Sequence, residues 1–427
     1  MLVNTGRLGR PLICLEVVDV MKKRIICLLL CCLSWAGTAG ARDLYVAAGA
    51  DGNGAKTAPF SHLWKAFLNL QPNDVIHVAE GTYRGFLGSG NFTVPASGCT
   101  LLGGYSRDFS RRDPFRLHTV LEQDPAYRGQ DRNSPILRLG EARAGAAGIT
   151  VDGFVLDGRT KSAYSDTGQI ILARSNLFPL LEVNAANVKI RNCIVINHSW
   201  KGIHGVWAGT NNEISNCFII NTYYAAFTSD GSKPGATVRF ANNTIAFIWQ
   251  RYSSRGAVQI GENLQALVEH NVFMYVQCPA VDNINAETVL RRNVFFQCQE
   301  GFYQGRSKTT HALAWRPEDL RTMEEYPELF RLKSAAGNTV QDTGIRPDPE
   351  YFRSFSDVFA QDTEKLDMDK LNDLRRQMGY TLDAPPPPAD RDITGRSYTL
   401  SAVVPALVYK GGEGAQPLPI SLTTKDR

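Results

Sequence analysis

Five short segments each end in a polar residue that follows a small residue and an apolar one, as in Gly202-Ile203-His204. The polar residues of the set are His204, Thr228, Gln259, Asp282 and Tyr303. Side chains alternate between the faces of a strand, so each apolar residue should point inward and each polar one outward. Side by side, these strands would expose the polar residues as one row with a spacing of ~4.8 Å. Such a row is either a binding or catalytic face or an ordinary solvated sheet.

The loops that enter these strands add aromatic and basic residues to the same face. They supply Trp200, Lys201, Tyr223, Tyr224, Arg251, Tyr252 and Arg255. Aromatic rings stack on sugar rings, and Arg and Lys pair with carboxylates. We therefore expect an extended polysaccharide as the ligand, and a uronate-containing polymer is one that this face could serve. The expected substrate-binding residues are Lys201, Trp200, Tyr224, Thr228, Tyr252, Gln259 and Tyr303.

β-Elimination on a uronate needs a cation to neutralise the carboxylate and a base to remove the C5 proton. Arg255 or Lys201 could do the first, and His204 or Tyr224 the second. These groups come from neighbouring segments of the predicted sheet. The sequence therefore permits a polysaccharide lyase.

Hydrolysis needs two carboxylates instead, and the face offers Asp230 and Asp282, with Glu262 as a further option. Asp230 follows Thr228 by two residues and joins the same face. Asp230 and Asp282 belong to segments two rungs apart, ~10 Å along the sheet, at or beyond the wide end for an inverting pair. A glycoside hydrolase or an epimerase stays open, and the candidate catalytic residues are His204, Arg255, Asp230 and Asp282.

The elements that must position these residues repeat along the chain. In five places an apolar residue, one or two variable residues and an asparagine precede an apolar strand. The asparagines are Asn192, Asn216, Asn243, Asn271 and Asn293. Their spacing of 22 to 28 residues predicts one turn of a solenoid per repeat. Stacked amides would pair both their donors and their acceptors inside such a solenoid.

The start of the region after residue 41 has features of a capped solenoid end. Tyr45-Val46, Pro59-Phe60 and a strand at Val75-Ile76-His77-Val78 surround a short helix, for which Ser61 is the expected N-cap. Leu63, Ala66, Phe67 and Leu70 would share one face of this helix. A helix there would cover apolar side chains and strand edges at the open end.

These residues and the recurring asparagines give the chain a resemblance to secreted right-handed parallel β-helix proteins of the pectin-lyase-like superfold. The resemblance covers residues 43 to about 306 and implies an internal asparagine ladder. It implies no particular activity. Ser229-Asp230-Gly231 matches the polygalacturonase motif only in part, and Lys233 with Arg255 imitates the Lys and Arg of alginate and dermatan lyases only loosely.

The predicted fold class is therefore all-β: a right-handed parallel β-helix, or single-stranded solenoid, with an N-terminal capping helix and a mixed α and irregular C-terminal appendage. The expected units are a leader at 1–41, the β-helix at 42–306 and the appendage at 307–427. Within the appendage, Pro317 to Phe330 and Thr363 to Gly379 have helical patterns, the second with Leu366, Leu371, Leu374 and Met378 as packing residues.

The leader has a basic start at Met21-Lys22-Lys23-Arg24, a short apolar run and a small-residue cleavage site at Ala39-Gly40-Ala41. We expect translation to start at Met21 and the protein to be exported, to the periplasm or beyond. The apolar run is too short to span a membrane, and no later stretch could do so. Of 46 basic and 42 acidic residues the leader holds five and two, which leaves 41 and 40. This balance argues against nucleic acid as a partner.

Five cysteines follow the leader: Cys99, Cys193, Cys217, Cys278 and Cys298. Their odd number and spacing argue against a zinc site and a disulfide-built fold. Cys193 and Cys217 occupy equal places in successive repeats, ~4.8 Å apart, so a disulfide and two stacked thiols are both open. Calcium could bind at Asp51-Gly52-Asn53-Gly54, but a plain turn explains this stretch as well, so the sequence fixes no cofactor.

Two functions remain. The first is an exported, monomeric β-helix protein that binds an extended polysaccharide and cleaves it by β-elimination. The second is a non-catalytic envelope or surface scaffold that displays loops to a partner. A lyase predicts Arg or Lys converging with His or Tyr in a groove, whereas a scaffold predicts side chains that are satisfied by their neighbours in the row.

Overall fold

The computed structural model describes residues 40–124, 126–129, 134–141, 145–158, 178–198, 200–222, 224–248, 256–300, 303–304 and 317–341. The predicted leader therefore lies outside the described residues, apart from Gly40 and Ala41. The second predicted helix of the appendage, Thr363 to Gly379, also lies outside them. No described helix is long and apolar enough to cross a membrane.

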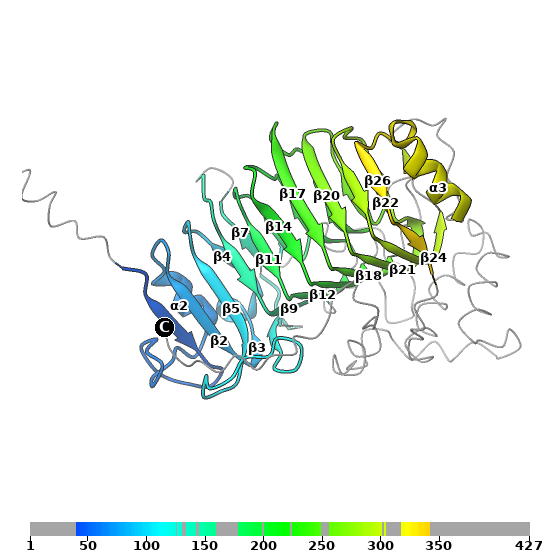
Figure 1. The fold of residues 1–427 in the computed structure, drawn as a ribbon. Coiled ribbons are helices and arrows are strands. Elements are labelled where there is room, and N and C mark those ends of the chain that lie inside the picture. The colour runs from blue at the N-terminus through cyan, green and yellow to red at the C-terminus, as the bar shows by residue number, and fades with distance from the viewer. Residues whose placement is uncertain are drawn as a thin grey trace, which may run out of the picture. The chain divides into compact units, whose positions relative to one another are not determined.

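The strands form three sheets in which every strand is parallel to its neighbours (Figure 1). Sheet 1 has ten strands, in the order β1 (Asp43–Val46), β2 (Val75–Ala79), β5 (Thr100–Tyr105), β8 (Thr150–Asp152), β11 (Lys189–Arg191), β14 (Asn212–Ser215), β17 (Ala236–Ala241), β20 (Leu264–Glu269), β23 (Val289–Arg291) and β26 (Ser334–Ala336). Sheet 2 has nine, in the order β3 (Gly81–Tyr83), β6 (Thr119–Leu121), β9 (Phe154–Asp157), β12 (Ile194–His198), β15 (Phe218–Thr222), β18 (Thr244–Ile248), β21 (Val272–Pro279), β24 (Val294–Glu300) and β27 (Thr339–Val340). Sheet 3 has eight, in the order β4 (Phe92–Val94), β7 (Leu137–Leu139), β10 (Leu181–Val183), β13 (Lys201–Gly205), β16 (Ala225–Thr228), β19 (Val258–Ile260), β22 (Val281–Asn283) and β25 (Tyr303–Gln304).

The chain visits the three sheets in turn, so that β11, β12 and β13 make one coil and β14 begins the next. This arrangement is the predicted parallel β-helix. Sheets 1 and 2 also extend past residue 306 through β26 and β27. The α-helix α3 (Pro317–Glu325) and the 3₁₀ helix η4 (Pro327–Phe330) precede these strands and coincide with the helical pattern seen in the sequence.

The helix α2 (Leu63–Leu68) is the predicted capping helix, and it buries Leu63 and Ala66 in the core. The predicted N-cap was wrong: the helix is capped at His62, which makes no side-chain capping hydrogen bond. Phe67 and Leu70 pack partly buried against the same core, as their helical spacing predicted. A second short 3₁₀ helix, η1 (Phe86–Gly88), follows β3.

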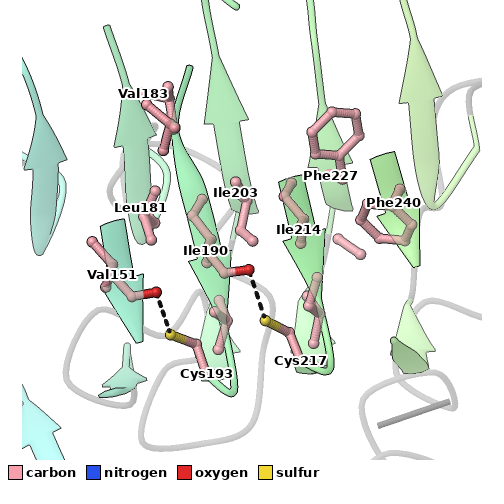
Figure 2. Packing of buried hydrophobic residues seen from close by; sticks show 14 of the residues in the cluster. Val151, Leu181, Val183, Ile190, Cys193, Ile203, Ile214, Cys217, Phe227 and Phe240 are labelled. Carbon is pink, nitrogen blue, oxygen red and sulfur yellow. Dashed lines mark hydrogen bonds between the residues drawn. The ribbon is translucent and has the colours of Figure 1, made fainter. Parts of the chain in front are cut away.

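The interior of the coil holds stacked apolar side chains, as Figure 2 shows for Leu181, Ile203, Ile190 and Ile214. Ile190, Ile214, Phe240, Val268 and Leu290 pair in register along sheet 1 and are fully buried. This continuous stack is the reason why the apolar residue recurs once per turn.

The asparagines occupy two different rows, which corrects the predicted alignment. Asn192, Asn216 and Asn242 have positive φ at the turn between sheets 1 and 2. Asparagine suits this left-handed position because its side chain hydrogen-bonds locally. The buried ladder stands one residue later, at Asn243, Asn271, Asn293 and Asn338. The sequence pattern mixed the two rows because both contain asparagine and Asn242-Asn243 contributes to each.

Cys193 and Cys217 stand at ladder positions in the coils that precede Asn243. Both are free thiols, so of the two readings left open the stacked thiols are the ones found. The Cys217 thiol donates to the carbonyl of Ile190 at 3.7 Å, and that of Cys193 to Val151 at 3.9 Å (Figure 2). Burial, followed by the neighbouring Cys193, raises the pKa of Cys217 well above its ordinary value. The Cys217 thiol is therefore a protonated core group rather than a reactive one.

Candidate functional site

The predicted polar row exists in register along sheet 3. His204 pairs with Thr228, Thr228 with Gln259, Gln259 with Asp282, and Asp282 with Tyr303. The side chain of Tyr303 lies outside what the structure describes, and Tyr252 and Arg255 lie outside it entirely. The row also continues backward to Glu182, Arg138 and Thr93.

The backward part of the row was missed because long insertions separate those strands from the regular repeats. Its signal was the alternation in Leu181-Glu182-Val183, which places Glu182 on the outward face. In the structure Arg138 Nε donates to Glu182 Oε2 at 2.5 Å, and Glu182 stands one rung from His204. A charged pair therefore borders the imidazole.

The middle of the row is buried, which corrects the expectation of an exposed face. Thr228 is 0%, Gln259 3% and Asp282 7% exposed. Parallel rungs bring these side chains close to one another and to the preceding loop, where they form hydrogen bonds. Gln259 Nε2 donates to the carbonyl of Gly256 at 3.0 Å, and His204 Nδ1 and Thr228 Oγ1 are 2.7 Å apart. Thr228, Gln259 and Asp282 are therefore buried on sheet 3 and do not form an open surface that a ligand could contact.

His204 is the half-buried member at the edge of this buried set. Burial, followed by the nearby positive charge of Lys201, lowers its pKa to about 4, although Asp230 and Glu182 act in the opposite direction. The imidazole is therefore neutral near pH 7. In that form it can accept a proton as a base but has none of the imidazolium's acidity.

A strip of aromatic and charged groups crosses this part of sheet 3. The rings of Trp200 and Tyr224 stack with centroids 4.2 Å apart and an interplanar angle of 25°. Lys201 Nζ lies 5.7 Å from the centroid of the Tyr224 ring and 3.9 Å from Asp230 Oδ2. The strip therefore connects the loop before β13 to the turn after β16.

Asp230 also lines a pocket with a volume of ≈ 350 Å³. The pocket is formed by the turns that follow β16, β19 and β22 together with one residue that follows η4. Its lining residues are Ser229, Asp230, Gly231, Ser232, Gly261, Glu262, Asn263, Ile284 and Arg331. The lining thus includes two acidic residues and one arginine beside serine, glycine and asparagine residues.

The pocket wall is held in place by its own hydrogen bonds. Ser229 Oγ donates to the carbonyl of Gln259 at 3.0 Å and accepts the backbone N–H of Gly261 at 2.8 Å. A Cβ at Gly261 would lie 3.0 Å from the Ser229 carbonyl oxygen, so glycine allows the two turns to approach. Ser232 Oγ donates back to the Ser229 carbonyl at 2.8 Å. The serine hydroxyls therefore hold the two turns that carry Asp230 and Glu262, and both hydroxyls are already hydrogen-bonded.

In the structure the carboxylate residue near Asp230 is Glu262, and not Asp282 as in the pair considered from the sequence. Asp230 and Glu262 belong to adjacent coils and line the same pocket, whereas Asp282 is buried on sheet 3 and does not line it. Arg331 was not predicted, since nothing in the sequence relates it to the turns of Asp230 and Glu262, which lie 101 and 69 residues earlier. Among the described residues, no group of three or more His, Cys, Asp and Glu side chains could hold a metal ion.

No protein-family model matches the sequence, and no curated protein sequence matches it either. Several solved structures are similar in fold. An alginate lyase from Paenibacillus sp. str. FPU-7 has 15% identity and a TM-score of 0.39, over 63% of this chain and 83% of that one. The pectin methylesterase PemA from Erwinia chrysanthemi has 14% identity and a TM-score of 0.34, over 81% of this chain and 100% of that one.

A pectin methylesterase from Yersinia enterocolitica has 13% identity and a TM-score of 0.34, over 66% of this chain and 90% of that one. With identities and TM-scores this low, the similarities give no argument about activity. The chemistry of this chain has to be inferred from its own residues.

Proposed function

We propose that this chain binds an extended polysaccharide along the strip from Trp200 to the pocket at Asp230. The observation that carries the proposal is the contact of Lys201 with both Tyr224 and Asp230, which joins stacked rings, a cation and a carboxylate-lined pocket. Rings present apolar faces to sugars, and charged groups hydrogen-bond their polar substituents. The pocket volume is within the range of small-molecule sites.

A uronate unit suits the Lys201 part of the strip best. The Lys201 to Asp230 pair is long at 3.9 Å, so a sugar carboxylate could compete for the ammonium group. The pocket itself holds more carboxylate than guanidinium and is better matched to sugar hydroxyls, which donate hydrogen bonds to Asp230 and Glu262. We expect a polymer that contains uronate units and lies across adjacent coils.

β-Elimination is the reaction that the described residues support best. Lys201 would neutralise the uronate carboxylate, and the neutral imidazole of His204 would remove the C5 proton. The electrons of the C5–H bond would form the C4–C5 double bond as the C4–O bond breaks, and the leaving oxygen would take a proton from solvent. The predicted leader would bring the protein outside the cytoplasm, where such polymers occur.

One observation favours the second candidate, a non-catalytic scaffold. Thr228 and Gln259 have hydrogen-bonding partners within the protein and are buried, as expected for a row that only stabilises the solenoid. The two functions differ in whether the strip catalyses a reaction of the polymer or only binds it. Binding alone would be consistent with both.

The experiment is a screen of the purified chain against pectate, alginate, dermatan and an uncharged polymer, with and without calcium. Retardation in polysaccharide-containing gels measures binding, absorbance of the unsaturated product measures elimination, and reducing ends measure any cleavage. We expect retardation by a uronate polymer and a rise in both chemical signals. Reducing ends alone would indicate hydrolysis and direct attention to Asp230 and Glu262, while retardation alone would support the scaffold.

Variants locate the binding strip. Trp200→Ala and Tyr224→Ala each remove one ring of the stack, and we expect about tenfold weaker binding from a loss of ~1.4 kcal/mol. Phe86→Ala is the matched control, because Phe86 is 58% exposed but lies on η1, in an earlier coil. Equal losses from all three variants, or no retardation by any polymer, would reject the strip.

A further inference from the structure

Five charged side chains follow one another along the outer face of sheet 1, one per coil. They are Arg191, Glu213, Arg239, Glu269 and Arg291, from the adjacent strands β11, β14, β17, β20 and β23 (Figure 1). Glu213 pairs with Arg191 and Arg239, and Glu269 pairs with Arg239 and Arg291. The signs alternate, so one carboxylate separates each arginine from the next. We call these five residues the charge ladder.

The charge ladder presents its arginines to solvent and covers its glutamates. The side chains of Arg191, Arg239 and Arg291 are 37%, 45% and 48% exposed, against 17% for Glu213 and 5% for Glu269. A ligand that approaches this face therefore meets guanidinium groups first. Three arginines against two glutamates also give the ladder a net charge of +1.

Each guanidinium gives only some of its donors to the glutamates. Arg191 contacts Glu213 through Nε and Nη2, and Arg291 contacts Glu269 through the same two nitrogens. Within the described part of the chain, Nη1 of these two arginines makes no hydrogen bond or ion pair, and neither does Nη2 of Arg239. A guanidinium has five donors in a planar fork that matches a carboxylate. The glutamates fix the orientation of these forks, which lowers the entropic cost of binding an anion.

The arginines recur at every second rung of sheet 1, which places them ~9.6 Å apart at ~4.8 Å per rung. Neighbouring units of a 1,4-linked polysaccharide with equatorial linkages point to opposite sides. One edge of such a polyuronate therefore carries a carboxylate at every second unit. Each sugar unit is about as long as one rung of a sheet, so the carboxylates of one edge recur as the arginines do.

We propose that the charge ladder binds a linear polyuronate with equatorial 1,4 linkages. The polymer lies along the solenoid axis, with the carboxylates of one edge on Arg191, Arg239 and Arg291. Leu267 is in register with Arg239, and Val289 follows it in the next coil. Both are half-buried and offer an apolar surface to the C–H groups of the sugar rings.

The shape of the ladder favours a polymer over a lipid surface. Its charges stand in single file over four rungs, or ~19 Å, whereas a membrane would be matched by charges spread in two dimensions. The ladder belongs to sheet 1 and the proposed strip at Trp200 to sheet 3, so this surface does not depend on the proposed function.

Arginine-selective modification with phenylglyoxal tests the proposal on the full, unsubstituted chain. Peptide mass spectrometry gives the modification rate of each arginine with and without mannuronate-rich alginate, a polyuronate with equatorial linkages. We expect the polymer to slow modification of Arg191, Arg239 and Arg291 by about fivefold or more. Arg84 is the matched control, because it is 43% exposed and pairs with the covered carboxylate of Glu122 but follows β3 of sheet 2. Its rate should stay within about twofold.

The same measurement on Trp200→Ala separates the ladder from the strip on sheet 3. Protection of the three ladder arginines that persists in this variant supports the ladder, whether or not the strip binds. Retardation of the unsubstituted chain in alginate gels without protection of these arginines would mean that the polymer binds elsewhere. That result would overturn the ladder proposal and leave the strip standing.

Other ligands test the chemistry of the ladder. Guluronate-rich alginate carries the same charge per unit, but its axial linkages give each edge a different repeat, so we expect weaker protection at equal uronate concentration. Equal protection by both alginates would overturn the match of spacing, and protection by dextran would exclude charge as its basis. Protection by anionic phospholipid vesicles alone would assign the face to a membrane. Modification that slows with protein concentration alone would assign it to a second copy.

A double variant, Arg191→Gln with Arg291→Gln, removes both ends of the ladder and changes its net charge from +1 to −1. Arg239 stays between the two glutamates, 3.8 Å from Glu213 and 2.8 Å from Glu269, so each carboxylate keeps a cationic partner. We expect about tenfold weaker alginate binding at Arg239, measured as the polymer concentration that gives half protection. Arg84→Gln should leave that concentration unchanged. Equal half-protection concentrations in the double variant and the unsubstituted chain would contradict the proposal.

Discussion

The thiol of Cys217 occupies the position in its coil that the amide of Asn243 occupies in the next coil. Asn243 Nδ2 donates to the carbonyl of Ile214 at 3.0 Å, and the Cys217 thiol lies 3.7 Å from the equivalent carbonyl, that of Ile190, with the carbonyl of Ser215 as a nearer acceptor at 3.2 Å. Asn243 Oδ1 in turn accepts the backbone N–H of Cys217 at 3.0 Å. The asparagine ladder therefore ends on a thiol that makes the same kind of contact more weakly.

Cys217→Asn should extend the ladder by one coil. The new amide nitrogen can donate to Ile190, and its oxygen can accept the N–H of Cys193, as Asn243 does for Cys217. We expect the free energy of unfolding to rise by about 1 kcal/mol, the usual net contribution of a buried hydrogen bond. Urea denaturation measures it, with Cys217→Ser as a control whose shorter side chain cannot reach both partners. A loss of stability equal to that of the serine variant would contradict this account.

Asn271→Ala should be among the most damaging single changes in the solenoid. Asn271 Oδ1 accepts the backbone N–H of Asn243 at 2.9 Å, while Nδ2 donates to the carbonyl of Phe240 at 2.9 Å and to Asn293 at 3.0 Å. Removal leaves several fully buried groups unpaired at about 1 to 3 kcal/mol each, so we expect a loss of about 3 to 5 kcal/mol.

Asn216→Ala is the control for Asn271→Ala. Asn216 belongs to the half-buried row of positive φ and donates to Asn192 Oδ1 at 2.7 Å. The backbone cost of alanine at this φ is about 1 to 2 kcal/mol, so the loss should be clearly smaller than for Asn271→Ala. Urea midpoints at unchanged slope would separate the two. Similar losses would mean that the buried ladder has no special role.

The repeats made the coil predictable because one apolar residue and one turn recur in every period. The row from His204 to Asp282 was predicted in register for the same reason. Its burial was not, since alternation gives the direction of a side chain but not what covers it. Likewise, Arg331 reaches the pocket through a contact distant in sequence, which no local pattern records.

The alternating charges on sheet 1 form a second ladder whose centre is Glu269, a residue that is 4% exposed. It accepts hydrogen bonds from Arg239 Nε and Arg291 Nε, both at 2.8 Å. Burial alone would raise the pKa of Glu269, but the hydrogen bonds from Arg291 and Arg239 outweigh it and lower the pKa. A lowered folded pKa gives stability that is present above the unfolded value of ~4.3 and is lost as the pH falls through the folded one.

Glu269→Gln should therefore cost about 2 kcal/mol at pH 7, as expected for hydrogen bonds to a charged group. The difference from the unmodified chain should shrink as the pH falls below ~4. Glu287→Gln breaks the exposed pair with Lys333, 2.9 Å apart, and should cost less than ~1 kcal/mol. Chemical denaturation at several pH values measures both. A Glu269→Gln cost that does not change with pH would exclude the charge as its source.

His204 should give the folded protein a distinct pH dependence. Its folded pKa of about 4 lies below the ordinary value of ~6.5. Between these values the unfolded chain binds a proton at this position and the folded chain does not. Stability from this group is therefore complete above pH ~6.5 and decreases as the pH falls toward 4, by about 1.4 kcal/mol per pH unit.

His204→Gln should remove this dependence, so that the loss of stability between pH 7 and pH 5 becomes smaller by about 2 kcal/mol. Glutamine retains a polar group near Thr228, which limits other effects, and His62→Gln at an exposed position is the control. An NMR titration of the imidazole resonances measures the pKa of His204 directly. A midpoint near 6.5 would mean that the imidazole is solvated and charged at mildly acidic pH. At pH 7 such an imidazole would still be mostly neutral, and it would be a stronger base than one with a pKa of about 4.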